Sequence, residues 1–406
     1  MPIVNRIADF HAEMTEWRHD LHAHPELALQ EVRTSAIVQE KLKSFGVDEI
    51  ITGLARTGVV GVIHGRGPES HAGGRAIGLR ADMDALPIHE ETSLPWASKN
   101  HGVMHACGHD GHTVMLLGAA KYLAETRNFD GTVFVIFQPA EENLGGGEIM
   151  VKEGLFERCK MTQVFGMHNW PQVPAGTFLW RNGPTMAAVA NIEITILGKG
   201  SHGAHPDHGI DPIVIAAQII TAFQSIVARS IDPTDSGVVT IGHISGGNTY
   251  NVIPETVHMK GTARYFAPEV GDKLELGVRR LATGIAASFG ASAEVVFDRA
   301  YPATVNDPEA TVMARAAATA VAGESRVRHM DKPTMGGEDF AFMLNAKQGS
   351  YVMLGGGKKD GGSQPGGTQA SDFMVHHPRY DFNDEILPVG ASYWATLAEQ
   401  LLPRQG

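Results

Sequence analysis

The sequence predicts an α/β protein with a mostly parallel central sheet flanked by helices and, inserted into it, a second α+β unit. Three observations support this fold class. A chain of 406 residues is too long for one ordinary core. Apolar runs such as residues 132–137 show little alternation, as expected of strands covered on both faces. A composition shift near residue 187 begins a stretch with its own order of elements.

The first part of the chain alternates predicted helices and strands. Apolar residues at helical spacing predict helices over residues 3–19 and 31–45, the second ending at Gly46 as a C-cap. Short apolar runs closed by polar or glycine-rich sequence predict strands over residues 58–64, 76–80, 132–137 and 163–167. Further helices are expected over residues 113–123 and 148–156.

The inserted stretch has the order βαββαβ. Its predicted elements are a strand 190–197, a helix 211–229, strands 237–245 and 257–266, a helix 269–289 and a strand 293–297. This order fits a small antiparallel sheet with two helices on one face. We therefore expect one domain over residues 1–186 and 300–406, and an inserted domain over residues 187–299.

The returning part of the first domain is predicted to hold four elements and one long loop. The elements are a helix 308–321, an apolar helix after the turn 334–339, a strand 350–354 and a final helix 387–402. The glycine-rich residues 355–368 are expected to form a mobile loop.

Composition narrows the class of partner. The formal net charge of −12, without any block of Lys or Arg, argues against nucleic acid or an anionic membrane and favours a small-molecule substrate. No stretch is expected to span a bilayer, and the first 20 residues carry acidic side chains rather than a basic and apolar signal. The two cysteines exclude a disulfide framework. A cytoplasmic location is expected.

Residues 105–112, His-Ala-Cys-Gly-His-Asp-Gly-His, combine three imidazoles, a thiol and a carboxylate just before an apolar helix. Cys107 and His109 are the residue types that bind zinc-like ions, and both could reach one site from a tight loop. An alternative interpretation is a capped helix, with Asp110 or Thr113 as the cap and solvated histidines. The histidines of residues 19–24 lack a neighbouring cysteine and are interpreted as structural.

Further polar clusters follow predicted strands. They are Asp82, the pair Glu141 and Glu142, His168, and His376 in the last third of the chain. In an open α/β sheet, loops at the carboxyl ends of strands converge on one crevice, so these side chains can meet Cys107 there. Two adjacent ions bridged by one anionic ligand would use the whole set. One ion surrounded by hydrogen-bonding partners is also possible, and Asp82 and Asp84 could simply cap a turn.

The motifs together resemble a known family across essentially the whole chain. They are Arg-Ala-Asp-Met-Asp-Ala-Leu-Pro at 80–87, His-Ala-Cys-Gly-His-Asp at 105–110, Gln-Pro-Ala-Glu-Glu at 138–142, Met-His-Asn at 167–169, Asn-Val-Ile-Pro at 251–254 and Gly-Gly-Glu-Asp-Phe at 336–340. This set resembles the metal-dependent aminoacylase and carboxypeptidase superfamily, in its hippurate hydrolase and auxin-conjugate amidohydrolase branch.

The resemblance implies a hydrolase that cleaves the amide of N-acyl amino acids with two divalent ions per subunit, Mn²⁺ or Zn²⁺, with Co²⁺ or Ni²⁺ as alternatives. A dipeptidase or carboxypeptidase of the same superfamily is the second candidate. A metal-stabilised binding protein without catalysis is a candidate of another class. The spare glutamate beside a ligand argues against that candidate, because a pure binding site does not need it.

The resemblance also implies residue roles. Cys107 would bridge the ions, with His109, Glu142, His168 and His376 as the other ligands, Glu141 as general base, Asp82 orienting a metal-binding imidazole, His202 stabilising the oxyanion, and Asn251 and Arg264 near the substrate. Two positions depart from the family pattern. Arg80 stands where sister branches have a metal-binding histidine, and His377 stands where the family has Ser or Asn.

The same resemblance implies a homodimer or homotetramer in which the inserted domain forms the contact. In sister enzymes the histidine corresponding to His202 crosses the dimer interface. The inserted domain could instead close over its own subunit as a lid, with hinges near Ala187 and Ala300.

Overall fold

The computed structural model describes residues 4–70, 74–357 and 373–404. The chain forms two compact units. The first comprises Met1–Thr185, Val305–Lys332 and Asp339–Gly406, and the second comprises Met186–Thr304 and Pro333–Glu338. The glycine-rich loop expected over residues 355–368 lies outside the described residues, apart from its first three residues.

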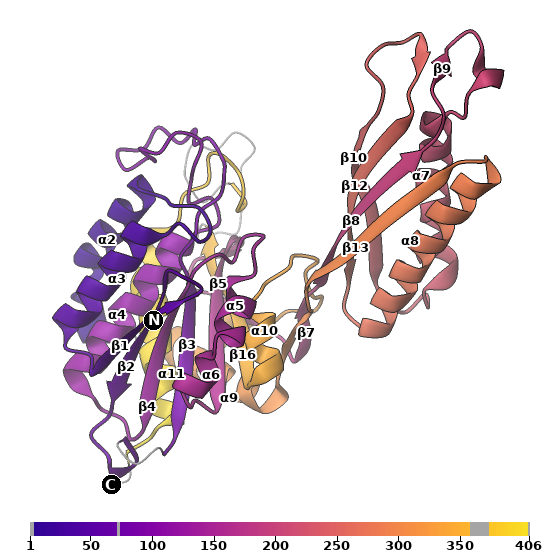
Figure 1. Cartoon of the computed structure of the whole chain (residues 1–406). Helices are drawn as coiled ribbons and strands as arrows, with labels where there is room; N and C mark the ends of the chain where they lie inside the picture. Colours follow the sequence, from indigo (N-terminus) through magenta and orange to yellow (C-terminus); the bar gives the residue numbers. More distant parts are fainter. Residues whose placement is uncertain (1–3, 71–73, 358–372, 405–406) are drawn as a thin grey trace. The chain divides into compact units, whose positions relative to one another are not determined.

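The first unit contains most of the helices and strands (Figure 1). Its strands are β1 (Glu49–Leu54), β2 (Gly58–His64), β3 (Ala76–Asp82), β4 (Thr132–Gln138), β5 (Gln163–Pro174), β6 (Phe178–Trp180), β15 (Val327–His329) and β16 (Gln348–Gly357). Its α-helices are α1 (Asn5–Ala8), α2 (His11–Ala23), α3 (Val32–Phe45), α4 (His109–Thr126), α5 (Gly146–Lys152), α6 (Leu155–Arg158), α9 (Pro308–Ala322), α10 (Ala341–Ala346) and α11 (Leu387–Leu401). Short 3₁₀ helices cover Pro68–Ser70, Glu324–Arg326 and Asp384–Ile386.

The described strands of this unit form one eight-stranded sheet with the order β1-β2-β4-β3-β5-β16-β6-β15. Its centre, β4-β3-β5-β16, is parallel, and antiparallel strands flank it on both sides. The carboxyl ends of the four central strands therefore lie at the same edge of the sheet. The polar residues that the sequence analysis placed after strands are brought to this edge.

Apolar side chains hold these central strands in place. Every residue of β3 is buried, and so is every residue of β4 after Thr132, as predicted for strands covered on both faces. The helices α4, α9 and α11 pack against the sheet and one another, and α5 and α10 form a second group against it. Gly46 ends α3 in the left-handed conformation expected of a C-cap, with φ 75°.

The second unit has the predicted βαββαβ order. Its main elements are β8 (Ala188–Leu197), α7 (Pro212–Ser230), β10 (Gly237–Ser245), β12 (Thr256–Tyr265), α8 (Pro268–Ser288) and β13 (Ser292–Tyr301). Two short strands, β9 (Ser201–His202) and β11 (Val252–Ile253), pair with each other, and a 3₁₀ helix covers Pro206–His208.

The four long strands of the second unit form an antiparallel sheet of order β10-β12-β8-β13. Ile192, Ile194 and Ile196 of β8 point into a core shared with α7 and α8, while the alternate residues of the strand are exposed or half-buried. This alternation shows that one face of the sheet is covered and the other is open.

Several boundaries differ from those predicted from the sequence. The first predicted helix is broken into α1 and α2 around Asp9 and Phe10, and the predicted helix 148–156 is divided between α5 and α6. β13 extends to Tyr301, and the Ala187 amide bonds to the carbonyls of Thr334 and Gly336, so residues 300–304 and 333–338 belong to the second unit. The short strands β7 (Gly183–Met186) and β14 (Thr304–Asn306) pair with each other and span the unit boundaries.

The sequence analysis was wrong about one apolar segment. By length and composition alone, the 19-residue helix α7 could cross a membrane, although no such stretch was expected. Scattered polar residues, among them Gln218 and Gln224, hid the overall apolar character of this helix. Ile215, Ile219 and Phe223 pack it into the core of the second unit. One side of this helix therefore packs into a core, while most of its residues are not buried.

Candidate metal centre

Six side chains of the first unit gather at the carboxyl edge of the parallel strands. Three overlapping groups have ligand atoms within 4.8 Å of one another: Cys107, His109 and His168; Cys107, Glu142 and His376; and His109, Glu141 and Glu142. The chain thus brings together all five residues predicted as ligands and the predicted general base. Cys107, His109 and Glu142 each belong to two of these three groups.

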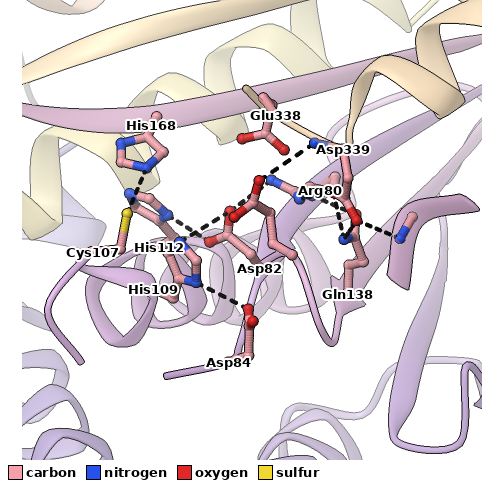
Figure 2. A network of polar contacts seen from close by, with 12 residues as sticks. Arg80, Asp82, Asp84, Cys107, His109, His112, Gln138, His168, Glu338 and Asp339 are labelled. Carbon is pink, nitrogen blue, oxygen red and sulfur yellow. Dashed lines mark hydrogen bonds and ion pairs between the residues drawn. The ribbon is translucent and has the colours of Figure 1, made fainter. Parts of the chain in front are cut away.

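The donors fit a divalent ion. Nδ1 of His109 lies 3.1 Å from Asp84 Oδ1, and a carboxylate only accepts, so the proton is on Nδ1. Nε2 of His109 is buried and makes no hydrogen bond within the described residues. Nδ1 of His168 donates to the Asn169 carbonyl at 2.6 Å, which leaves Nε2 facing Cys107 Sγ at 3.3 Å (Figure 2). Two imidazole nitrogens and a thiol are the donors that zinc-like ions prefer.

Burial and neighbouring charges shift the pKa values of four side chains in this cluster. Burial raises the pKa of the Cys107 thiol. Burial opposes the charged form of His109, but Asp82 and Cys107 raise its pKa well above the ordinary value. Hydrogen bonds with Cys107 and Glu142 raise the pKa of His376 to about 10. Burial lowers the pKa of His168 well below its ordinary value. Positive charge is therefore favoured beside Glu142 and Cys107.

Three residues in the loops that carry these ligands have positive φ angles. Ala140 and Asn143, on either side of the two glutamates, have φ of 56° and 72°, and His376 has φ of 67°. Such left-handed residues cost free energy and persist where the surroundings fix them. The backbone N–H of Ala140 donates to Glu31 at 2.9 Å, and that of His376 donates to the Ala106 carbonyl at 2.6 Å.

Asp84 holds two of the predicted ligands. One carboxylate oxygen contacts His109 Nδ1 at 3.1 Å, and the other accepts the backbone N–H of Glu142 at 2.9 Å. The sequence analysis expected Asp82 to orient a metal-binding imidazole; Asp84 makes the closer contact with His109, and Asp82 Oδ2 lies 3.8 Å from His109 Nε2. Because the two aspartates are only two residues apart, only the turn after β3 decides which of them faces His109.

Asp82 makes its closest histidine contact with His112. Its Oδ1 lies 2.6 Å from His112 Nδ1, and His112 Nε2 accepts the backbone N–H of Asn169 at 2.9 Å. Both ring nitrogens of His112 are thus engaged, so His112 links the ends of β3 and β5. Burial opposes ionisation of Asp82, but His109, His112 and Arg80 hold its pKa well below the ordinary value.

Arg80 is buried and neutralised by the same network (Figure 2). Its guanidinium donates to Gln138 at 2.8 Å, to Asp82 at 2.7 Å and to Asp339 at 3.0 Å. Asp339 also accepts from the backbone N–H of Gly147 at 2.7 Å. The arginine that replaces the histidine of sister branches is therefore bound by two carboxylates.

The two adjacent histidines near the C-terminus differ in their contacts. His376 Nε2 lies 3.0 Å from Glu142 Oε1. His377 Nδ1 accepts the backbone N–H of Arg379 at 3.0 Å, and its ring stacks on Phe373 with centroids 4.3 Å apart. Of the two, His376 belongs to the cluster.

The three remaining predicted residues lie in the second unit. His202 is exposed, and its Nδ1 accepts the backbone N–H of Ala204 at 3.0 Å, which leaves the proton on Nε2. The Gly203 N–H donates to the Asn251 carbonyl at 2.7 Å, so the His202 and Asn251 loops lie side by side. Arg264, near the other end of β12, is half-buried, and burial lowers its pKa; no carboxylate among the described residues forms a salt bridge with its side chain.

Sequence reasoning missed several residues that support the cluster. They are Asp84, His112, Asn169, Asp339 and Tyr380. The first four lie in or beside the quoted motifs, and that position was the available signal. Tyr380 lies four residues beyond His376 in a segment without a motif of its own.

Comparisons with known proteins identify the family of this chain. Residues 78–400 match the family model of peptidase family M20/M25/M40. The hippurate hydrolase of Campylobacter jejuni is 39% identical over 402 residues, which cover 99% of this chain and 100% of that protein. The N-acetylcysteine deacetylase of Bacillus subtilis is 40% identical over 390 residues, which cover 96% of this chain and 97% of that protein.

A solved structure is similar as well. The YXEP protein of Bacillus subtilis, a dinuclear metal binding peptidase from the M20 family, is 36% identical and superposes with a TM-score of 0.80 over 98% of this chain and 100% of that one. The chain belongs to peptidase family M20/M25/M40, in its amidohydrolase branch.

Proposed function

We propose that this protein is a metal-dependent amidohydrolase that cleaves N-acyl amino acids, such as hippurate, into a carboxylic acid and a free amino acid. The observation that carries the proposal is the position of Glu141. Its carboxylate lies with Glu142 and His109 in one group, so a second carboxylate stands beside a ligand set. The full-length relatives named hippurate hydrolase and N-acetylcysteine deacetylase support the same reaction class.

The residues that would hold two divalent ions are Cys107, His109, Glu142, His168 and His376. Cys107 is proposed as the bridge because it belongs to two of the ligand groups and is the only thiol among them. Bound ions would activate a water and polarise the substrate carbonyl. Mn²⁺ or Zn²⁺ is proposed, with Co²⁺ or Ni²⁺ as alternatives, since all accept imidazole and carboxylate.

Glu141 acts as the general base in this proposal. It takes a proton from the attacking water at a carboxylate oxygen, the water oxygen bonds to the amide carbon, and the same proton passes to the leaving nitrogen as the C–N bond breaks. The backbone N–H of Asp339 lies 3.4 Å from Glu141 Oε1. A contact of this kind limits the rotation of the carboxylate.

Residues of the second unit supply substrate contacts. Arg264 lacks a counter-ion among the described residues, and we assign it to the substrate carboxylate. His202 presents an Nε2–H donor, which suits an oxyanion. Asn251, beside it, is assigned to the substrate amide.

The geometry within the second unit favours action in trans. His202 pairs with Val252 beyond one end of β12, whereas Arg264 lies near the other end, eight residues past Thr256. At about 3.3 Å per residue this separation is about 26 Å, far longer than an N-acyl amino acid. We therefore assign His202 and Arg264 of one chain to two different substrate molecules. We propose a homodimer, or a homotetramer built from such dimers, in which His202 serves the partner's site.

Complementation tests this arrangement. His202→Ala and Glu141→Gln protein, each inactive alone, should recover part of the activity after mixing, because one hybrid site then has both residues intact. No recovery, or a monomer by light scattering at assay concentration, would leave only a lid that acts within one subunit.

A cytoplasmic location is part of the proposal. Cys107 and Cys159 are both buried and unbridged. A thiol that must remain free to bind metal suits a reducing compartment.

A substrate panel tests the reaction itself. N-acyl amino acids and dipeptides are assayed with Mn²⁺, Zn²⁺ or Co²⁺, and the best substrate is then used with Glu141→Gln. We expect metal content near that of the wild type and turnover about 100 to 10,000-fold lower. The matched control is Glu40→Gln, at an exposed position of α3, which should leave turnover unchanged. Faster turnover of dipeptides than of acyl amino acids would indicate the dipeptidase or carboxypeptidase.

A further inference from the structure

Asn169, the residue after His168, has its amide group engaged on both sides. Nδ2 donates to the Cys107 carbonyl at 2.7 Å and lies 3.0 Å from His112 Nε2, while Oδ1 accepts from the Tyr380 hydroxyl at 2.7 Å. The amide orientation is determined by these partners, because the reverse orientation would place oxygen against the Cys107 carbonyl oxygen. Asn169 and Tyr380 are both almost completely buried.

These contacts reach three segments that carry predicted ligands. The backbone carbonyl of Asn169 holds the His168 ring at 2.6 Å, and its side chain holds the carbonyl of Cys107. Tyr380 belongs to the same segment as His376, where the Tyr380 N–H donates to the His377 carbonyl at 2.9 Å. The Asn169–Tyr380 pair thus joins loops that are distant in sequence.

Gly108 shows how tightly this pair fits. A Cβ built on Gly108 would lie 2.5 Å from Asn169 Nδ2 and 2.6 Å from the Tyr380 hydroxyl. Gly108 also has φ of 91°, a conformation that side chains rarely adopt. The turn between Cys107 and His109 therefore closes directly against the two side chains, and their positions determine where both ligands point.

We propose that Asn169 and Tyr380 are positioning residues that set the spacing of Cys107, His168 and His376 for metal binding. The inference rests on the proposed metal centre. Neither residue touches the ions or the substrate in this proposal. Their effect passes through the Cys107 carbonyl and the turn at Gly108, in the way that hydrogen-bonding partners of metal ligands usually act. Burial holds the pKa of Tyr380 well above its ordinary value, so the hydroxyl remains a donor throughout the working pH range.

The experiment measures metal affinity of the full-length protein directly. Metal-stripped wild type, Tyr380→Phe and Asn169→Asp are titrated with Zn²⁺ in competition with a chromophoric chelator. The absorption of the Co²⁺-loaded forms reports the Co²⁺–thiolate bond. Tyr393→Phe is the matched control, because Tyr393 is equally buried and its hydroxyl has no hydrogen-bond partner within the described residues.

We expect Tyr380→Phe and Asn169→Asp to bind Zn²⁺ about 10 to 100-fold more weakly than the wild type and to shift the thiolate band. Turnover should recover in Tyr380→Phe at saturating metal. Tyr393→Phe should match the wild type in all three measurements. Equal affinities and spectra in Tyr380→Phe and Tyr393→Phe would overturn the inference, even if Asn169→Asp did not fold. A wild type that takes up no ion would instead refute the metal centre.

Discussion

The pair formed by His22 and Asp110 gives a quantitative prediction for stability against pH. His22 Nδ1 lies 2.8 Å from Asp110 Oδ2, His22 Nε2 lies 3.4 Å from Glu90, and His22 is fully buried. Burial opposes the charged form of His22, but Asp110 and Glu90 raise its pKa from 6.5 to about 9. The folded state therefore binds the proton more tightly than the unfolded state does.

This difference in proton affinity determines how the free energy of unfolding changes with pH. Stability from the His22 charge is complete below about pH 6.5, declines as pH rises, and is lost above about pH 9. Each pKa unit corresponds to about 1.4 kcal/mol, so the full contribution is about 3 kcal/mol. Replacing His22 by Gln removes the titration and leaves the other titrating groups in place.

The assay is urea unfolding of wild type and His22→Gln in metal-free buffer at pH 6 and at pH 10. The free-energy difference between the two proteins should be larger at pH 6 by about 3 kcal/mol. His329→Gln, at an exposed position, is the control and should show no such change. A difference between wild type and His22→Gln that is the same at both pH values would refute the raised pKa and the assignment of charge to this pair.

Three further substitutions test the metal centre and its supports. Cys107→Ala should lose metal and activity together, and two ions still bound at full occupancy by metal analysis would contradict the bridging role. Gly108→Ala should destabilise by about 1 to 3 kcal/mol in urea unfolding, because its Cβ meets Asn169 at 2.5 Å at a positive φ. Gly46→Ala, where φ is also positive but nothing lies within 4 Å, should cost clearly less. Arg80→Met should cost about 3 to 5 kcal/mol, since it removes the cation that two buried carboxylates share, and a loss below 1 kcal/mol would argue against that pairing.

The residues at the carboxyl edge of the sheet were predictable because each of them is recognised from a short stretch of sequence. A fully apolar strand such as β4 is recognised without any knowledge of its neighbours, and Glu141 and Glu142 follow it directly. The thiol and imidazoles of residues 105–112 are recognised as possible metal ligands from their residue types alone. Strand ends and rare side chains together were enough to predict which loops meet.

The contacts between those loops were not predictable. Whether Asp82 or Asp84 faces His109 depends on the turn after β3, which composition does not determine. His168 was expected in a loop, but it lies within β5, which runs to Pro174. Its partner β16 comes late in the chain, so the pairing that extends β5 has no local signal.

Short edge strands were missed for a similar reason. β1 has mostly exposed or half-buried residues, so its apolar positions do not alternate clearly. β6 and β15 contain three residues each; they pair with each other, and β6 also pairs with β16. Such strands exist because a sheet edge is available, which no window of sequence can show.

The pairing of β5 with β16 also dictates an order of events during synthesis on the ribosome. Gln163 lies opposite Gln348, and residues 186–304 between them form the main body of the second unit. That body is contiguous in sequence, so it can fold as soon as it emerges, whereas β5 keeps an unpaired edge until β16 has been made. His376 emerges later still. A nascent chain halted before residue 340 should therefore carry a protease-resistant second unit beside a first unit that cannot yet bind metal.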